Sequence, residues 1–333
     1  RGDVMVGESG TELLFRLIRT AATELPEKGA MLSSTLEHPA SMSAMKKWAK
    51  NTHRDHLIVK HDDETGTVDE RAYIKKLTSN VSLVSIVHTS PVTGMTVDLE
   101  KITKEVRNVN PECIIIVDGI QHSSHGAIDV QKYDIDGYVV SPYKMFSRHG
   151  YGVAWASERL CALNKEQLAD GPAQNWELGT RDAGSYATFS DVVDYLDWLG
   201  SNFTDSENIR ERLEVSSLVI KSHEQELVNL VLKGTKDLAG LTNKNNIQVI
   251  GNLTSASREG VVSFYHKNKP SSLIVEQLRE RKIRVHIRKD DHYCGNILKP
   301  LKQKDCIRFS ICHYNSKAEV VKFLEAINEI ITD

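Results

Sequence analysis

The chain has 333 residues, of which 40% are hydrophobic and 26% charged, and its formal net charge is −3 at pH 7. This composition is that of a folded globular protein, and the length predicts one large and one smaller domain. The near-neutral charge gives no reason to expect binding to nucleic acid or to an anionic membrane, and no run of about 18 apolar residues could span a bilayer.

The first half of the chain alternates between strand and helix patterns. An apolar stretch at 4–6 precedes a helix in which apolar residues recur at the helical period from Leu13 to Ala21. Ser9 or Thr11 could cap this helix, whose free N–H groups would suit a phosphate; a plain capped helix is the alternative. Strands are predicted at 30–36, 57–59 and 81–88, with helices beginning at Pro39, Asp69 and Val97.

Two strand ends in the middle of the chain carry the residues with the clearest chemistry. The β-branched run Ile114–Val117 predicts a buried strand that ends at Asp118, and the apolar run Gly137–Val140 predicts a second that leads to Lys144. Open α/β sheets bind ligands at such ends. Taken singly, the aspartate would be a turn or cap residue and the lysine a solvated one. Together they form the pair of a pyridoxal phosphate enzyme, in which lysine forms the Schiff base and aspartate faces the pyridinium nitrogen.

The second half predicts a smaller α+β domain after a long, charged linking helix at 207–238. A further strand is expected at 150–155, before a long helix that contains Val192 and Leu199. The remaining elements are predicted to be strands at 248–250, 261–266, 284–287 and 307–312, and helices at 271–281 and 317–331. We therefore predict a large domain at 1–205 and a small one at 206–333.

Three motifs resemble the class V aminotransferase and cysteine desulfurase family. They are Val-Asp118-Gly-Ile-Gln121, His125-Gly-Ala-Ile-Asp-Val, and Asp136-Gly-Tyr-Val-Val-Ser141-Pro-Tyr-Lys144. The resemblance implies the α/β fold of the fold type I pyridoxal phosphate enzymes, with a mainly parallel sheet and a small C-terminal domain. It also implies that the strand at 150–155 is antiparallel. Because family members carry several tens of residues before the phosphate motif, we expect an N-terminal segment to be missing.

The resemblance assigns a role to each motif residue. In the family the residues matching Gly10 and Thr11 hold the cofactor phosphate, and a histidine at position 38 stacks flat on the pyridine ring. Gln121 would form a hydrogen bond with the ring oxygen of the cofactor. An arginine matching Arg308 binds the substrate α-carboxylate through two parallel hydrogen bonds. The threonine that matches Thr180 would reach the phosphate bound by a partner subunit, which implies a homodimer. The cofactor-binding residues implied are Gly10, Thr11, His38, Asp118, Gln121, Ser141, Tyr143, Lys144 and Thr180.

Two positions leave the exact reaction open. Desulfurases carry an asparagine where this chain has Pro91, and proline has no side-chain amide to offer. Cys294, in Asp291-His-Tyr-Cys-Gly, falls on the sulfur-accepting cysteine of one desulfurase branch if His292 is aligned, although Arg288–Asp290 resembles an insertion. A buried, inert thiol is the alternative for Cys294. A second branch of the family has no nucleophile there.

We therefore rank a cysteine desulfurase or C–S lyase first, and a class V aminotransferase or amino-acid epimerase second. A non-catalytic scaffold of the same fold is a third reading, against which the intact Asp118–Lys144 pair argues. The expected partners are a small amino acid and a second copy of the chain. Five cysteines that are odd in number and lack metal-ligand spacing (Cys113, Cys161, Cys294, Cys306 and Cys312) predict no metal and a reducing, cytoplasmic compartment.

Overall fold

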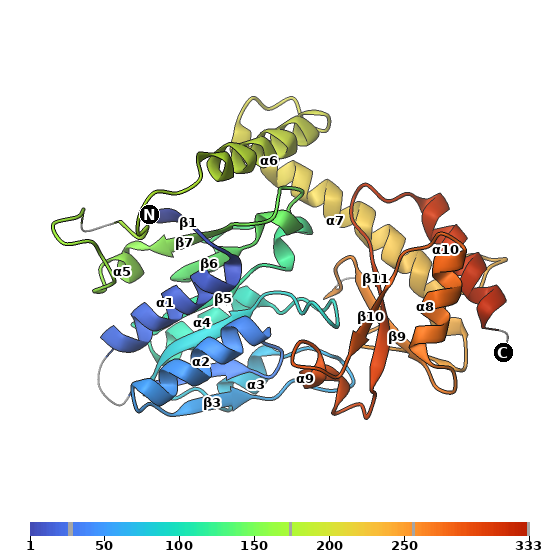
Figure 1. Cartoon of the computed structure of the whole chain (residues 1–333), viewed down its shortest axis with the longest axis horizontal. Coiled ribbons are helices and arrows are strands. Elements are labelled where there is room, and N and C mark those ends of the chain that lie inside the picture. The colour runs from blue at the N-terminus through green and yellow to red at the C-terminus, as the bar shows by residue number, and fades with distance from the viewer. Residues whose placement is uncertain (26–28, 173–174, 255–256, 332–333) are drawn as a thin grey trace. The chain divides into compact units, whose positions relative to one another are not determined.

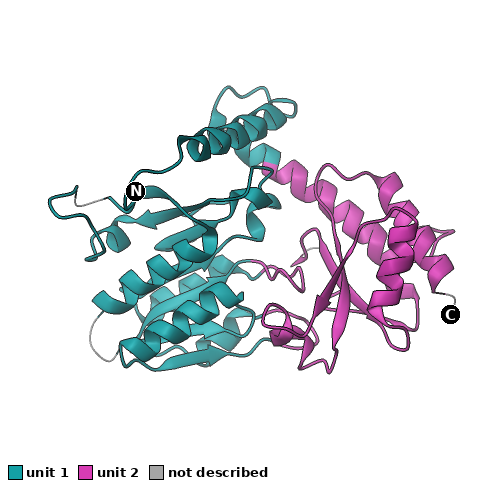
Figure 2. Ribbon diagram, in the orientation of Figure 1, with its two compact units in different colours: residues 1–61, 68–88, 97–216 teal, residues 62–67, 89–96, 217–333 magenta. Residues whose placement is uncertain are grey.

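The computed structural model describes residues 1–25, 29–172, 175–254 and 257–331. The chain divides into two compact units, which Figure 2 distinguishes by colour. The first comprises residues 1–61, 68–88 and 97–216, and the second comprises 62–67, 89–96 and 217–333. The main boundary between the two units thus lies after residue 216, and two short earlier segments, 62–67 and 89–96, belong to the second unit. The domain boundary expected at residues 205 and 206 stays a prediction.

A seven-stranded, mostly parallel sheet forms the centre of the first unit (Figure 1). Its strand order is β1-β7-β6-β5-β4-β2-β3. The strands are β1 Gly2–Gly7, β2 Ala30–Ser34, β3 His56–Val59, β4 Val81–Val87, β5 Ile114–Asp118, β6 Gly137–Val140 and β7 Gly152–Ser157. Strands β3, β2, β4, β5 and β6 run parallel, whereas β7 is antiparallel to both of its neighbours, β6 and β1. The predicted α/β class and the antiparallel strand after Lys144 are confirmed.

The helices of the first unit follow the alternating order that the sequence predicts. They are α1 Gly10–Glu24, α2 Pro39–Asn51, α3 Glu70–Ile74, α4 Leu99–Val109, α5 Glu158–Cys161 and α6 Ala183–Ser201, followed by α7 Ile209–Lys233, which continues into the second unit. Helices α1 and α2 pack side by side on the sheet (Figure 1). Leu13, Leu14, Leu17 and Ile18 lie on the buried face of α1, where they join Met31, Leu83 and Ile116 of the sheet in one apolar core. Burial of this core holds α1 against the strands that carry the candidate site.

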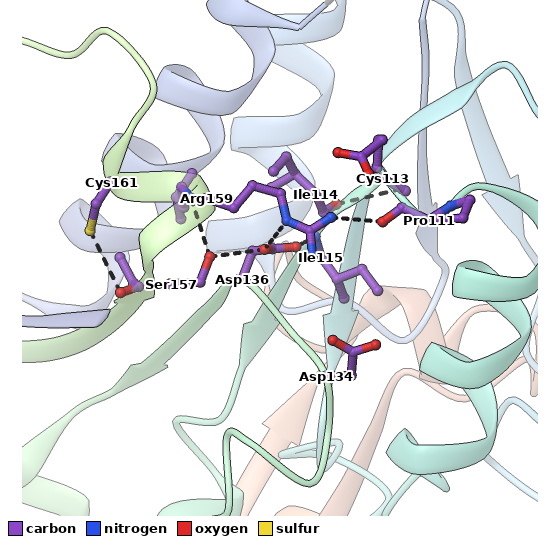
Figure 3. Close-up of polar contacts among 12 residues, drawn as sticks. Pro111, Cys113, Ile114, Ile115, Asp134, Asp136, Ser157, Arg159 and Cys161 are labelled. Carbon is purple, nitrogen blue, oxygen red and sulfur yellow. Dashed lines mark hydrogen bonds and ion pairs between the residues drawn. The ribbon is translucent and has the colours of Figure 1, made fainter. Parts of the chain in front are cut away.

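A buried ion-pair network fixes the edge of the sheet opposite to Asp118. Figure 3 shows Asp136, which directly precedes β6 and whose carboxylate is almost fully buried. Its oxygens accept hydrogen bonds from the Ile115 N–H at 3.0 Å and from the Ser157 hydroxyl at 2.9 Å. Arg107 and Arg159 pair with the same carboxylate at 2.9 and 3.1 Å. Strands β5, β6 and β7 are therefore tied together at their far ends.

The second unit contains a four-stranded antiparallel sheet of order β10-β11-β9-β8. Its elements are β8 Ile247–Val249, β9 Val261–His266, α8 Ser271–Glu280, β10 His286–Lys289, α9 Gly295–Leu298, β11 Asp305–Ser310 and α10 Lys317–Ile330. Phe264 and Ile307 of the sheet form a core with Phe323 of α10 and Leu227 of α7. Ser316 and Glu319 form a capping box at the start of α10, which places that helix as the sequence predicts.

Candidate active site

Strands β5 and β6 are parallel neighbours, so the segments that follow them meet at one edge of the sheet. Asp118 is the last residue of β5, and Lys144 ends the single 3₁₀ turn Pro142–Lys144 after β6. Asp118 is buried, and this burial raises the pKa of its carboxyl group above the ordinary value. The positive charges of His38 and Lys144 counteract part of that rise. The structure therefore brings together the carboxylate, the imidazole and the amine that the sequence predicts as neighbours.

The amine of Lys144 is held by the predicted glutamine. Its Nζ donates a hydrogen bond to Oε1 of Gln121 at 3.0 Å. The amide nitrogen of Gln121 lies 3.2 Å from Nε2 of His125. Because Oε1 accepts from the lysine, the amide nitrogen donates to His125, whose ring proton then belongs on Nδ1. This series of hydrogen bonds, from His125 through Gln121 to Lys144, fixes the position of the lysine amine.

The N-terminus of α1 lies against the turn after β6. Ser9, rather than Thr11, caps the helix, and its hydroxyl accepts the Glu12 N–H at 3.1 Å. A Cβ atom on Gly10 would lie 2.5 Å from Oγ of Ser141 and 2.6 Å from Cδ1 of Ile120, so a larger residue here would have to displace these two side chains. The helix therefore presents its N-terminal N–H groups beside Ser141, which is an arrangement that suits an anion.

His38 links α2 to the same site. It is the N-cap residue of α2, and its Nδ1 accepts the Ala40 N–H at 3.2 Å, with Pro39 in the first turn. This cap fixes the orientation of the half-buried imidazole. The charge of His38 acts to lower the pKa of Asp118, against the effect of burial.

Glu37 is a buried residue of this region to which the sequence analysis gave no role of its own. Its carboxyl group accepts the Val87 N–H at 2.9 Å and the Ser41 hydroxyl at 2.8 Å. The hydroxyls of Ser34 and Ser85 donate to it at 3.3 Å each. Burial raises the pKa of Glu37 to about 8, and the nearby charge of Asp118 acts in the same direction. Glu37 thus joins β2, β4 and α2 beneath His38.

A histidine pair was also missed. His88 follows β4 directly, and its N–H donates to the Asp118 carbonyl at 2.9 Å. Its ring stacks on His122, with centroids 3.7 Å apart and an interplanar angle of 25°. Nδ1 of His88 lies 2.9 Å from the Tyr138 hydroxyl. In the sequence His122 directly follows Gln121 and His88 ends a predicted strand, but the contact between the two rings depends on the parallel pairing of β4 and β5.

Three predicted cofactor residues of the first unit are exposed. The Tyr143 ring is 43% exposed and stacks on His149 at 4.4 Å. Thr180 lies on the surface, although its neighbour Arg181 pairs with Glu8 at 2.6 Å, close in sequence to Gly10. Thr11 is also exposed. The roles of these three residues stay predictions.

Arg308 and Cys294 lie in the second unit. Arg308 is half-buried on β11, and its Nη1 donates to the Pro91 carbonyl at 3.2 Å. Cys294 is 3% exposed and stands at the start of the short helix α9. Burial raises the pKa of its thiol, although the charges of Arg288 and Arg308 act in the opposite direction. A buried thiol with a raised pKa is a poor nucleophile at neutral pH, and the role of Cys294 stays a prediction.

The chain is similar to known proteins over nearly its whole length. A family model described as "Aminotransferase class-V" matches residues 2–323. The chain belongs to the class-V aminotransferase family. It is 25% identical over 313 residues to a probable cysteine desulfurase of Pseudomonas putida, covering 89% of this chain and 70% of that protein. It is also 25% identical over 343 residues to the aminotransferase-like protein FGM3 of Gibberella zeae, covering 99% and 79%.

Solved structures share the class-V fold. The apo cysteine desulfurase of Thermococcus onnurineus NA1 superposes with a TM-score of 0.80 at 21% identity, covering 99% of this chain and 79% of that one. The cysteine desulfurase CsdA of Escherichia coli gives 0.79 at 20% identity, covering 98% and 78%. The predicted family and fold are therefore confirmed. Each helix in the described part of the chain is too short or too polar to cross a membrane.

Proposed function

We propose that this class-V family member is a pyridoxal phosphate enzyme that cleaves the C–S bond of cysteine or a closely related amino acid. The observation that carries the proposal is the meeting of Asp118 and Lys144 at adjacent ends of β5 and β6, with Gln121 bonded to the lysine amine. The Pseudomonas putida relative is named a probable cysteine desulfurase and the two solved structures are named cysteine desulfurases, which supports the choice of substrate.

The residues of the first unit fit the cofactor. The N-terminus of α1 at Gly10 and the hydroxyl of Ser141 would hold the phosphate, since N–H groups at a helix start favour an anion. Asp118 would face the ring nitrogen, and the His38 ring would stack on the cofactor. When bound, the cofactor withdraws electrons from the substrate α-carbon. Buried Asp118 gains a cationic partner in this arrangement, which offsets the cost of burying its charge.

The chain's own groups would then handle the substrate. Lys144 would take the proton from the α-carbon or return it, because a lysine amine near the reacting atom can act as a general base when it is neutral. Gln121 holds that amine in place. Arg308 would bind the α-carboxylate, since a planar guanidinium matches a carboxylate with two parallel hydrogen bonds.

The fate of the sulfur depends on Cys294. As an acceptor it would leave alanine and a protein persulfide, and this route needs a thiolate. The burial of Cys294 and the raised pKa of its thiol favour the second candidate, a C–S lyase that releases sulfide by β-elimination. Sulfide and alanine release from cysteine by the native protein and by Cys294→Ala separates the two. Loss of alanine formation in Cys294→Ala would support the persulfide route, and unchanged turnover would leave elimination.

We also propose a homodimer in a reducing, cytoplasmic compartment. Only Ser185, Val192 and Gly200 of α6 are buried, while Tyr186 and Trp198 expose 44% and 60% of their surfaces. Aromatic residues are enriched at protein–protein interfaces, which supports α6 as the contact surface. Helix α6 begins shortly after Thr180, so a partner that covers α6 could bring that threonine to its own phosphate site. All five cysteines are free thiols, which supports the reducing compartment.

Trapping the cofactor tests the central proposal. Borohydride reduction of the purified, cofactor-loaded protein, followed by proteolysis and mass spectrometry, should find the pyridoxyl group on Lys144. Lys144→Ala should show no adduct and no turnover, whereas Lys132→Ala, which removes an exposed lysine paired with Glu100, should behave as the native protein does. An adduct on another lysine would refute the assignment.

A further inference from the structure

Residues 89–96 form a hairpin whose contacts belong to the second unit. The hydroxyls of Thr89 and Thr96 lie 3.0 Å apart across its base, and the Ser90 N–H donates to the Met95 carbonyl at 3.0 Å. Gly94 closes the tip with a φ of 73°, and a Cβ there would lie 2.1 Å from the Val261 carbonyl. The hairpin is thus held tightly against the start of β9.

Three consecutive carbonyls of the hairpin accept hydrogen bonds from three different side chains. Arg308 donates to Pro91 at 3.2 Å, Ser263 to Val92 at 2.5 Å, and Arg258 to Thr93 at 2.6 Å. Ser263 and Arg308 are direct cross-strand partners in the pairing of β9 with β11, so their side chains lie on the same face of the sheet. The register of the sheet therefore sets the spacing at which they meet the carbonyls.

Arg258 makes this backbone rigid. Its side chain is 2% exposed and bonds carbonyl oxygens rather than a carboxylate. Besides Thr93, it donates to the carbonyls of Val261, Ile250 and Asn252. Burial lowers the pKa of Arg258 to about 10, so the group stays charged at neutral pH. Its hydrogen bonds to the carbonyls are therefore charge-assisted and stronger than those of a neutral donor. Pro91 therefore stands on a stretch of chain that the second unit holds in place.

We propose that Pro91 is a positioning residue whose carbonyl directs the Arg308 guanidinium toward the substrate carboxylate. This inference rests on the proposed role of Arg308 in binding that carboxylate. A guanidinium has five N–H donors, so donation to one carbonyl is compatible with a two-pronged contact to a carboxylate. The proline ring fixes its own φ near −65°, which limits the directions that the carbonyl can take. An arginine oriented before binding loses less side-chain freedom on binding.

The inference also gives a role to the position at which the chain departs from the desulfurase pattern. Proline offers no side-chain amide, but its carbonyl contacts the very arginine that is assigned to the substrate. Position 91 would then determine carboxylate recognition through the backbone.

Binding measurements with two probes test this. The first probe is 3-mercaptopropionate, which keeps the thiol and carboxylate but lacks the amine, and the second is cysteamine, which lacks the carboxylate. Isothermal titration calorimetry on the cofactor-loaded protein should show about a tenfold higher Kd for 3-mercaptopropionate in Pro91→Gly, with the Kd for cysteamine unchanged. Ser263→Ala, which releases the neighbouring carbonyl, should act in the same direction. Pro300→Gly, at an exposed proline of the same unit, is the control and should change neither.

Arg308→Ala separates the inference from the function on which it rests. If Arg308→Ala weakens 3-mercaptopropionate selectively while Pro91→Gly and Ser263→Ala do not, the positioning role is refuted and the carboxylate role stands. If Arg308→Ala weakens both probes equally, or neither, the carboxylate role itself fails. An equal loss of both probes in Pro91→Gly would indicate a merely structural effect and would also refute the inference.

Discussion

Nζ of Lys144 donates to Oε1 of Gln121 at 3.0 Å, although the two residues follow different strands and stand 23 positions apart in the chain. The contact exists because β5 and β6 are parallel neighbours and each is followed at once by a tight turn. Any change in the charge of residue 121 will therefore act directly on the lysine amine.

Gln121→Glu should shift the pH dependence of turnover. A carboxylate at the position of Oε1 favours the charged amine and raises the pKa of Lys144. Because the general base must be neutral, the acid limb of the pH–kcat profile should move up by about one unit. Gln131→Glu, at a residue just before Lys132 on a surface turn, serves as the matched control. An unmoved acid limb in Gln121→Glu would contradict the general-base role of Lys144.

Glu37→Gln should remove a pH dependence of stability. The pKa of Glu37 is raised from 4.5 to about 8 in the folded protein, so the folded state binds more protons than the unfolded state between these values. The native free energy of unfolding should therefore fall as the pH rises through this range. Each unit of pKa difference corresponds to about 1.4 kcal/mol. Urea unfolding at pH 5.5 and 8.5 should show a smaller decrease for the variant. Equal decreases in both proteins would refute the assignment.

Asp136→Ala should destabilise the fold strongly. The Asp136 carboxylate is buried between Arg107 and Arg159, so its removal leaves two cations without their shared partner, at a cost of about 3–5 kcal/mol. Asp134→Asn is the matched control, because Asp134 pairs with the same Arg107 at 3.3 Å but its side chain is 66% exposed, and asparagine tolerates the positive φ of 49° at this position. Its loss should cost less than about 1 kcal/mol. Chemical denaturation measures both, and similar costs for the two variants would be the contrary result.

Trp198→Asp should shift the protein from dimer toward monomer. A charge in place of an exposed aromatic side chain on α6 would be buried without a partner in the proposed interface. Light scattering coupled to size-exclusion chromatography measures the mass in solution. Leu273→Asp changes another exposed apolar residue, on α8, and should leave the mass unchanged. A dimer that persists in Trp198→Asp, or a native protein that is monomeric, would argue against α6 as the interface.

The sequence predicted the sheet of the first unit well because its strands are apolar runs bounded by turn residues. Strand β6 and strand β9 have the predicted bounds, and Asp118 and Lys144 lie at neighbouring strand ends as expected. Less regular segments moved. The strand predicted at 284–287 is β10 at 286–289, because its position is set by pairing of His286 with Arg308 rather than by its own pattern. Helix α3 is limited to 70–74.

Two parts of the candidate site could not be predicted, because no local sequence pattern indicates them. The acceptors of Arg308, Ser263 and Arg258 are backbone carbonyls, which every residue possesses, so composition cannot reveal them. The donors around Glu37 are common residues from β2, α2 and β4, and only the folded sheet brings them together. A buried carboxyl group becomes recognisable when its surroundings are known.

The hairpin at 89–96 also constrains how the chain can be made and divided. Its side-chain partners, from Arg258 to Arg308, leave the ribosome more than a hundred residues after the hairpin itself. Until then the carbonyls of Pro91, Val92 and Thr93 can accept hydrogen bonds only from water. Contacts this distant in sequence slow folding and prolong exposure to aggregation. A fragment that begins at residue 217 would therefore contain the sheet of the second unit without the hairpin. Residues 62–96 would have to be added as a separate peptide to restore the hairpin contacts.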